Sequence, residues 1–300
     1  MPIPVLLNGA SGAGNNIERV PMLVEAFRKA GLEVDIRVSR NGAEMTELAT
    51  RAVAEKHPVI VAAGGDGTVS TVAGMVARSE SALGVLPMGT LNHFARDLGV
   101  ALDLDEAVRT IAAGHLEPVD VGEVNGRIFV NNSSLGLYPA LVIHRERQRR
   151  RLGRGKWHAL FWATLTVLRR HPMLDVKLCL EDAIQKRRTP LVFIGNNDYK
   201  VEGFDIGRRA RIDQGRLGIY LIRRRGRHGL IGLAVRALFG LLRPARDFEA
   251  LEAQTIGIET RHRTLPVATD GEVTVMEMPL EYKIHPRALR VIVPAAAATT

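Results

Sequence analysis

Along the first 120 residues, short apolar runs alternate with longer stretches in which apolar positions recur every three or four residues. The short runs predict strands at residues 3–7, 32–38, 58–61 and 83–86. The helical spacing is clear in the stripe formed by Val20, Leu23, Val24 and Phe27. Because strands and helices alternate, the pattern predicts a parallel, doubly wound sheet with ligand-binding loops at the carboxyl ends of its strands.

The pattern changes near Val119, after which short alternating runs follow one another with little helix between most of them. Val119–Val124 and Arg127–Val130 flank Asn125-Gly126, a strong signal for a two-residue β-hairpin. Further runs lie at residues 176–180, 191–194, 217–222, 254–259 and 273–276. They predict an antiparallel sandwich or a barrel-like second domain.

These patterns divide the chain into three parts. We expect an α/β domain over residues 1–120 and an all-β domain over residues 121–287. A C-terminal strand and tail follow over residues 288–300, in which the run 290–293 is compatible with packing on either domain.

Composition narrows the classes of partner. The 300 residues carry a net charge of +9, which favours nucleic acid, an anionic lipid surface or a phosphorylated substrate. The single cysteine excludes an internal disulfide and fits a reducing cytosol. We find no secretory signal, and no stretch reaches about 18 uninterrupted apolar residues, so we expect no spanning helix.

Two basic amphipathic stretches interrupt the β region, at residues 144–170 and 223–243. Arginine runs at 149–151 and 223–225 stand beside Trp, Phe and Leu positions. This composition is typical of a helix at an anionic bilayer surface, and a core helix with solvated flanks is the alternative. Nucleic acid is the weaker interpretation, because no helix-turn-helix, zinc-finger or RNA-binding signature is present.

Candidate chemistry is concentrated in the glycine-rich turn of residues 64–68, between a predicted strand and a predicted helix. Glycine admits close approach of a ligand, and a helix N-terminus suits a phosphate. Asp66 within this turn makes sense if Mg²⁺ lies between it and the phosphate, or if it orients neighbouring groups. An ordinary tight turn with a solvated carboxylate is the alternative.

Two further turns follow predicted strands. The loop of residues 8–16 has glycine spacing close to a phosphate-binding P-loop, but Asn15 and Asn16 replace the required Lys and Ser/Thr. It is either a second phosphate or ribose cradle or a plain turn. The third turn spans residues 87–92. Because these loops follow the first, third and fourth strands, they are consistent with one shared site.

The turn at 64–68 resembles the Gly-Gly-Asp-Gly-Thr signature of diacylglycerol, sphingosine and NAD kinases and, more loosely, of phosphofructokinases. Residues 89–96 resemble the Gly-Thr-x-Asn-Asp-x-Ala-Arg block of diacylglycerol and related lipid kinases. The Thr-Pro-Thr-Gly-Ser element of NAD kinases is not found. Matches to other blocks of the family follow in order along most of the chain: Asn8 with Ser11-Gly12, Gly195-Asn196, Gly203, and Asp270-Gly271-Glu272. The chain is most similar to the bacterial soluble lipid kinases.

This resemblance implies a Rossmann-like nucleotide-binding domain, a β-sandwich domain and an active site between them. It implies that Glu272 is the general base with Asp270 beside it, and that Asp66 acts with Mg²⁺ at the phosphates of ATP. The implied nucleotide-binding residues are Asn8, Ser11, Gly12, Ser39, Gly64, Gly65, Asp66, Gly67, Thr68, Val69, Ser70, Thr90 and Asn92.

The chain departs from the family pattern at two places. His93 stands where many members have Asp. The resemblance also implies a structural Mg²⁺ in the second domain, held here by the backbone carbonyls of Arg211 and Arg216 and by Gln214. The neutral carbonyl of Gln214 is a weaker ligand than a carboxylate, so either this site is lost or Asp213 substitutes.

We therefore expect an ATP-dependent lipid kinase that acts on diacylglycerol or a related glycerolipid. Its expected location is cytoplasmic and peripheral at the inner membrane face, with a homodimer as one option and no nucleic-acid partner. The alternatives are a kinase for a soluble acceptor such as NAD and a nucleotide- or lipid-binding regulator without turnover.

Overall fold

The computed structural model describes residues 1–9, 16–139, 173–180, 183–200, 208–209, 211–223, 232, 236 and 247–295. The two basic stretches lie outside these residues apart from Arg223, Gly232 and Arg236, and so do Ser11, Gly12 and Gly203. Within the described part of the chain, no helix is both long enough and apolar enough to cross a bilayer.

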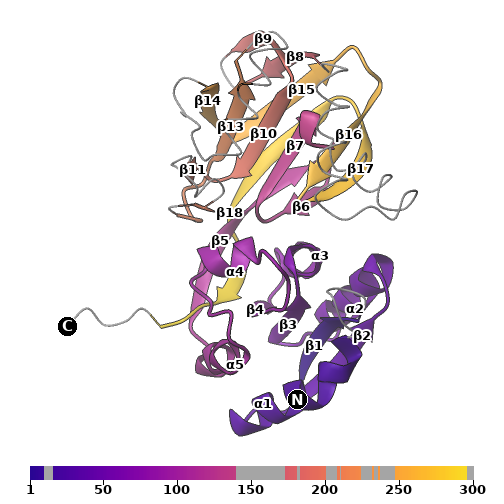
Figure 1. Ribbon diagram of the computed structural model, residues 1–300, viewed down its shortest axis with the longest axis vertical. Coiled ribbons are helices and arrows are strands. Elements are labelled where there is room, and N and C mark those ends of the chain that lie inside the picture. The colour runs from indigo at the N-terminus through magenta and orange to yellow at the C-terminus, as the bar shows by residue number, and fades with distance from the viewer. Residues whose placement is uncertain are drawn as a thin grey trace, which may run out of the picture.

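The N-terminal half is a parallel sheet covered by helices (Figure 1). Its strands pair in the order β2-β1-β3-β4, and all three pairings are parallel, as the alternating pattern predicts. They are β1 (Ile3–Asn8), β2 (Val34–Ser39), β3 (Val59–Gly64) and β4 (Ala82–Pro87). The helices are η1 (Asn16–Arg19), α1 (Val20–Lys29), α2 (Gly42–Ala54), α3 (Asp66–Val76), α4 (His93–Asp97) and α5 (Leu104–Ala113).

The second half is an antiparallel sandwich. One layer has the order β14-β13-β10-β7-β16-β17, and the other contains β18-β15-β8-β9, with β5 paired to β18 and β6 paired to β5. Buried Leu135 and Ile194 of the first layer pack with Ile258 and Tyr282 of the second in one hydrophobic core. A separate pair is formed by β11 and β12. The strands are β5 (Leu116–Val124), β6 (Arg127–Phe129), β7 (Asn132–Gly136), β8 (Leu174–Cys179), β9 (Ile184–Thr189), β10 (Leu191–Asn196), β11 (Tyr199–Lys200), β12 (Arg208–Arg209), β13 (Leu217–Ile222), β14 (Phe248–Ala253), β15 (Thr255–Thr260), β16 (Thr264–Thr269), β17 (Glu272–Glu277) and β18 (Leu280–Ile292).

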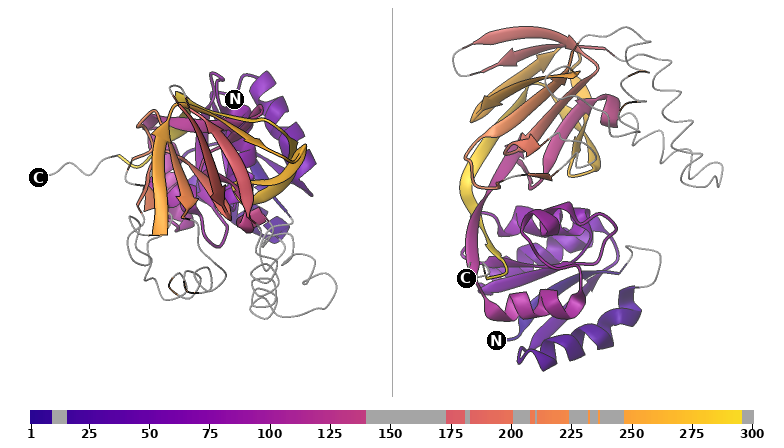
Figure 2. Two further views of the ribbon diagram at one scale, coloured as in Figure 1. Left: turned by 90° about the horizontal axis from the view of Figure 1, so that it is seen from above. Right: turned by 60° about the vertical axis from the view of Figure 1, so that its left-hand side comes forward.

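One sheet is common to both halves, because β5 and β18 run from the sandwich into the N-terminal half (Figure 2). The end of β18 pairs with β4 in parallel, with Arg290 opposite Ala82. The run expected at 290–293 is therefore mostly the end of a longer strand that reaches the first sheet. The boundary expected between residues 120 and 121 falls inside β5, and the one before residue 288 falls inside β18.

A bulge between His285 and Leu289 bends β18 where it passes from one half to the other. Arg287 has a φ of 54° there, and its N–H donates to Asp120 Oδ1 at 2.8 Å. The other oxygen of the buried Asp120 carboxylate accepts from Gly215 N at 2.6 Å. Asp120 therefore holds the bend against the loop before β13.

One Asn-Gly pair and one Asp-Gly pair form tight hairpin turns. Asn125 and Gly126 join β5 to β6 with φ values of 45° and 84°, and Asp270 and Gly271 join β16 to β17 with 48° and 86°. Two consecutive positive φ values are typical of a type I′ turn, which explains the choice of these residues. The hairpin predicted around Asn125-Gly126 is confirmed.

Candidate active site

The site begins where the two glycine turns of the N-terminal half touch. β3 and β4 are adjacent, and the turns that follow them place Gly65 against Gly89. A Cβ on Gly89 would lie 2.4 Å from the Cα of Gly65, so only glycine permits this approach. A Cβ on Gly64 would lie 2.5 Å from Thr68 Oγ1. The paired glycines therefore let the two turns pack against each other and against the start of α3.

Asn92 shapes the second turn instead of facing a ligand. Its φ is 51°, its Oδ1 accepts from Gly89 N at 2.9 Å, and its Nδ2 donates to Gly89 O at 3.0 Å. The side chain is buried, whereas neighbouring Thr90 is exposed. Of these two implied nucleotide-binding residues, Thr90 is the one that a ligand can reach.

A cavity of about 220 Å³ opens at the N-terminus of α3. It is lined by Asn8, Gly42, Met45, Gly65, Gly67, Thr68, Thr71 and Glu272. Asn8 Nδ2 donates to Thr68 Oγ1 at 3.2 Å, which joins the end of β1 to the first turn of α3. Unpaired N–H groups and a partial positive charge at a helix start suit an anion, so this cavity fits a nucleotide phosphate.

Other residues of the implied nucleotide site have different surroundings. Ser39 is fully buried at the end of β2, and Val69 lies in the core of the N-terminal half. Ser70 donates its hydroxyl to Asp270 Oδ2 at 2.5 Å. These three residues are not among those that line the cavity.

Asp66 begins α3 and turns toward the second glycine turn. Its Oδ1 accepts from Phe94 N in α4 at 3.4 Å. The carboxylate thus joins the starts of two helices, which agrees with a role in orienting neighbouring groups. The contact is long for an N–H···O bond, so its loss has a small energetic cost.

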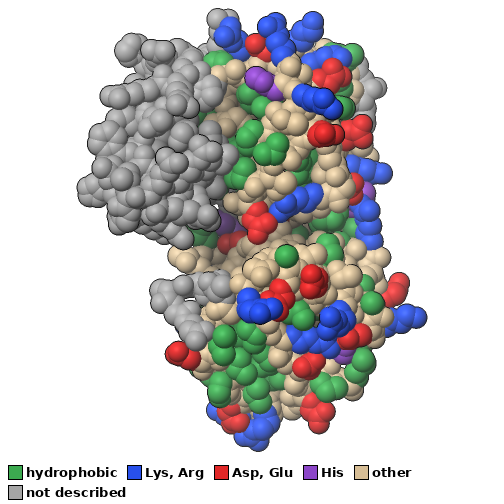
Figure 3. Space-filling model, turned by 90° about the vertical axis from the view of Figure 1, so that its right-hand side faces the viewer, with side chains coloured by type: hydrophobic (Ala, Val, Ile, Leu, Met, Phe, Trp, Pro, Cys, Tyr) green, Lys and Arg blue, Asp and Glu red, His purple; other side chains and the backbone are tan. Residues whose placement is uncertain are grey.

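The tip of the β16–β17 hairpin reaches from the sandwich to α3. Asp270 bonds Ser70, and Glu272 Oε1 lies 3.5 Å from where a Cβ on Gly67 would stand. The surface is hollowed at the level where the two halves meet (Figure 3). The hairpin therefore brings a carboxylate of the sandwich to the phosphate-type cavity of the N-terminal half.

The Asp270 carboxylate is buried and fully engaged. It accepts backbone N–H groups from Val130 at 2.8 Å, Asn131 at 2.8 Å and Asn132 at 3.0 Å, besides the Ser70 hydroxyl. Burial raises the pKa of this carboxyl, and the hydrogen bonds act in the opposite direction. An acid held by four donors is poorly placed to receive a proton from substrate, which favours Glu272 as the base.

Replacing Asp270 tests this anchoring role. Asp270→Ala leaves four donors without their acceptor, and each unsatisfied buried group costs about 1–3 kcal/mol. We expect the free energy of unfolding, measured by urea titration, to fall by about 3 kcal/mol or more. A fall below about 1 kcal/mol, the cost of one such group, would contradict the anchor, and Asp175→Ala at an exposed site is the control.

Glu272 is half-exposed and is held by a side chain that the sequence did not single out. Arg127 Nη2 lies 2.7 Å from Glu272 Oε2, and its Nη1 donates to Thr274 Oγ1 at 2.6 Å. Arg127 begins β6, directly after the Asn-Gly turn. This contact joins two hairpins whose residues Arg127 and Glu272 are 145 positions apart in the sequence, so nothing in the local pattern of the chain indicates it.

The side chains of the residues implied for a Mg²⁺ site in the second half are engaged in other contacts. The Asp213 carboxylate is bound by Arg211 at 2.9 Å, and Gln214 Oε1 accepts from Asp198 N at 3.1 Å. Arg216 forms ion pairs with Asp198 and Glu252. Throughout the described residues, no group of three or more His, Cys, Asp or Glu side chains could hold a metal ion.

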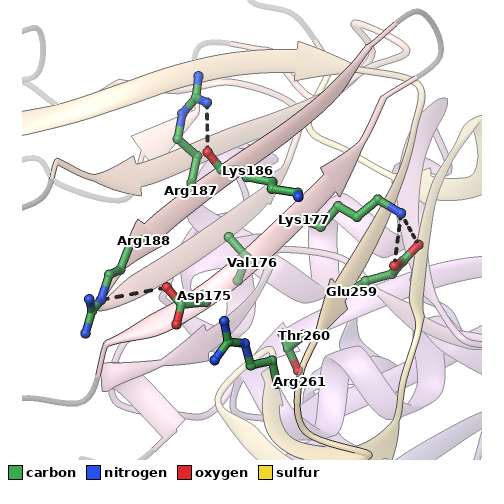
Figure 4. Close-up of a pocket in the computed structure, with 9 residues that line it drawn as sticks. All are labelled: Asp175, Val176, Lys177, Lys186, Arg187, Arg188, Glu259, Thr260 and Arg261. Carbon is green, nitrogen blue, oxygen red and sulfur yellow. Dashed lines mark hydrogen bonds and ion pairs between the residues drawn. The ribbon is translucent and has the colours of Figure 1, made fainter.

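A larger hollow of about 440 Å³ lies elsewhere, on the face of β8, β9 and β15 (Figure 4). Lys177 points to Glu259 at 3.1 Å, and Arg188 to Asp175 at 3.7 Å. β8 and β9 form the end of the long sheet opposite β2. This charged surface is therefore separate from the cavity at the glycine turns.

Comparison with known proteins agrees with this architecture. A solved structure of a diacylglycerol kinase from Bacillus anthracis superposes with a TM-score of 0.71 at 22% identity, over 99% of this chain and 98% of that one. The two proteins thus share one fold, with an α/β half and an antiparallel β-sandwich.

Family models and relatives identify the chain more closely. Residues 2–124 match the diacylglycerol kinase catalytic domain, and residues 140–293 match the YegS C-terminal NAD kinase beta sandwich-like domain. A "Probable lipid kinase YegS-like" of Pseudomonas aeruginosa is 30% identical over 95% of this chain and 92% of its own length. A diacylglycerol kinase of Bacillus subtilis is 34% identical over 42% of this chain and 43% of its own. The chain belongs to the diacylglycerol kinase and YegS-like family and is a lipid kinase.

Proposed function

We propose that this lipid kinase transfers the γ-phosphate of ATP to the hydroxyl of diacylglycerol or a related glycerolipid. The observation that carries the proposal is the position of Glu272, which lines the same cavity as Gly65, Gly67 and Thr68. A phosphate cradle and a carboxylate from opposite halves of the molecule thus face one space. The names of the relatives support the lipid acceptor.

Each group of residues at the site has its own role in the proposed reaction. The glycine turn and the start of α3 hold the phosphates, and Thr90 is exposed for contact with the nucleotide. Glu272 takes the proton from the lipid hydroxyl as the phosphoryl group leaves ATP, while Arg127 and Thr274 fix the strand that carries Glu272. Asp66, the first residue of α3, would hold Mg²⁺, which would neutralise charge on the phosphates.

A labelling experiment separates the proposed function from its alternatives. The purified protein is incubated with γ-labelled ATP, Mg²⁺ and a total-lipid extract, with NAD added in a parallel reaction. Label in the organic phase supports a lipid kinase. Label on a soluble nucleotide would instead identify a soluble acceptor, and no label at all would leave a binding protein without turnover.

We also propose that the protein works in the cytoplasm, peripherally bound to the inner face of the membrane. The arginine runs at 149–151 and 223–225 support this, since each cation near an anionic surface is worth about 1 kcal/mol. We expect binding to anionic vesicles in co-sedimentation to weaken as salt rises, because screening shortens the reach of charge. The proposal would be contradicted if binding changed neither with salt nor with Arg→Ala substitutions in these runs. Neutral vesicles are the control.

A further inference from the structure

A buried arginine connects the sandwich to the second glycine turn. Arg209 in β12 has a side chain that is 0% exposed, and its Nε lies 2.8 Å from the Asp97 carboxylate, which is 3% exposed. Asp97 is the last residue of α4, the helix that follows the turn packed on Gly65. A charge pair so deeply buried needs excellent geometry and further hydrogen bonds to persist.

The remaining hydrogen bonds of the Arg209 guanidinium are all made to residues of the second half. Arg209 Nη1 donates to Val130 O at 2.6 Å and to Asn196 O at 3.1 Å, and Nη2 donates to Asn131 Oδ1 at 3.1 Å. The guanidinium also lies between the rings of Phe94 and Tyr199, with centroids at 5.9 and 5.8 Å. Its planar fork thus spans two elements that come from opposite halves of the molecule.

The segment that Arg209 holds is the one that holds Asp270. Arg209 binds the carbonyl of Val130, while Asp270 binds the N–H groups of residues 130–132. Asp270 in turn bonds Ser70 of α3, and Glu272 follows two residues later. Residues 130–132 are therefore linked to α4 through the Arg209 guanidinium and to α3 through the Asp270 carboxylate.

These contacts close a ring that returns to α3. Asp66 at the start of α3 accepts from Phe94 in α4, and Asp97 of α4 pairs with Arg209. Arg209 holds residues 130 and 131, which anchor Asp270, and Asp270 bonds Ser70 one turn into α3. Every step of the ring except the contact of Phe94 is 3.1 Å or shorter.

We infer that Arg209 is a positioning residue, which through Asp97 and residues 130–131 fixes the distance between the glycine turns and the hairpin that carries Glu272. The effect of Arg209 on kcat rests on the proposed function, but its effect on the distance between the two halves does not. Because small displacements of reacting groups are costly, a looser junction lowers kcat more than it weakens binding of ATP.

The sharpest test is Arg209→Lys. Lysine keeps the charge beside Asp97, but one ammonium cannot replace the guanidinium fork that reaches Asp97, Val130 and Asn131 together. Spin labels on the natural Cys179 of β8 and on Lys29→Cys at the exposed end of α1 report the distance between the halves by pulsed EPR. The matched control is Arg187→Lys, whose ion pair with Glu249 lies at the outer edge of the sandwich.

We expect Arg209→Lys to broaden the distance distribution and to lower kcat about 10- to 100-fold with little change in KM for ATP, while Arg187→Lys changes neither. A distribution as narrow as that of the wild type in folded Arg209→Lys would overturn the inference, whatever the kinase assay shows. If Arg209→Lys does not fold, Asp97→Asn is measured instead, and an unchanged distribution there overturns it equally.

Discussion

Glu272→Gln is expected to lower kcat by about 10²–10⁴-fold, the range that a positioned general base contributes. The lipid hydroxyl is a poor nucleophile until its proton has an acceptor, and the amide keeps the shape of the side chain without its basicity. Because Glu272 is half-exposed and bonds only Arg127 among the described residues, we expect the fold and ATP binding to persist. Steady-state kinetics with a lipid acceptor and a thermal melt measure both effects.

Glu277→Gln is the matched control, because Glu277 ends the same strand and is exposed. It should leave kcat unchanged. If Glu272→Gln phosphorylates lipid at a rate near that of the wild type, with chemistry shown to be rate-limiting, Glu272 is not the base. Asp270 would then be the next candidate in spite of its four donors.

Asp66→Ala is expected to abolish turnover while the melting temperature stays close to that of the wild type. The carboxylate makes one long contact to Phe94, so its removal costs little stability. Asp66 is the first residue of α3, beside the glycine turn that we propose binds phosphate. Loss of the proposed magnesium ligand would remove the neutralisation of charge on the transferring group.

The control for Asp66→Ala is Asp105→Ala, which removes an exposed acid from the first turn of α5. It should leave kcat unchanged. Near-normal activity of Asp66→Ala would refute the assigned role of Asp66. A large fall in melting temperature would show instead that the contact with Phe94 is a major structural element.

Much of the fold follows from local patterns. Alternation of apolar runs and helical stripes predicts a parallel sheet in the N-terminal half, and Asn125-Gly126 predicts the β5–β6 turn. Each of these features depends on residues close together in the sequence. The glycines of residues 64–67 likewise predict a turn, although not that Gly65 would pack on Gly89.

The partners of the polar residues could not be predicted in the same way. Asp270 binds residues 130–132, and Arg127 binds Glu272, across separations of about 140 residues. A hairpin signal at Asp270-Gly271 says nothing about which side the carboxylate faces, since that depends on the register of β16 with β7. Arg209 and Asp97 gave no signal for the same reason.

The boundaries expected after residues 120 and 287 fall inside two strands, β5 and β18. β5 and β18 carry apolar residues on both sides of the junction between the halves, because both strands belong to the one sheet that runs through the molecule. Val119 and Val121 pack in the core of the N-terminal half, whereas Val124 of the same strand packs in the sandwich. Hydrophobic periodicity records burial and does not record which core receives the side chain.

Transfer of label from γ-labelled ATP to purified diacylglycerol in detergent micelles shows whether the protein phosphorylates this lipid. The wild type and Glu277→Gln should place label in the organic phase as a lipid phosphate, and Glu272→Gln and Asp66→Ala should leave almost all of it in the water-soluble phase. A folded wild type that labels no lipid would contradict the proposed lipid kinase activity. A Glu272→Gln variant that labels diacylglycerol as fast as the wild type would contradict the role of Glu272 as the base.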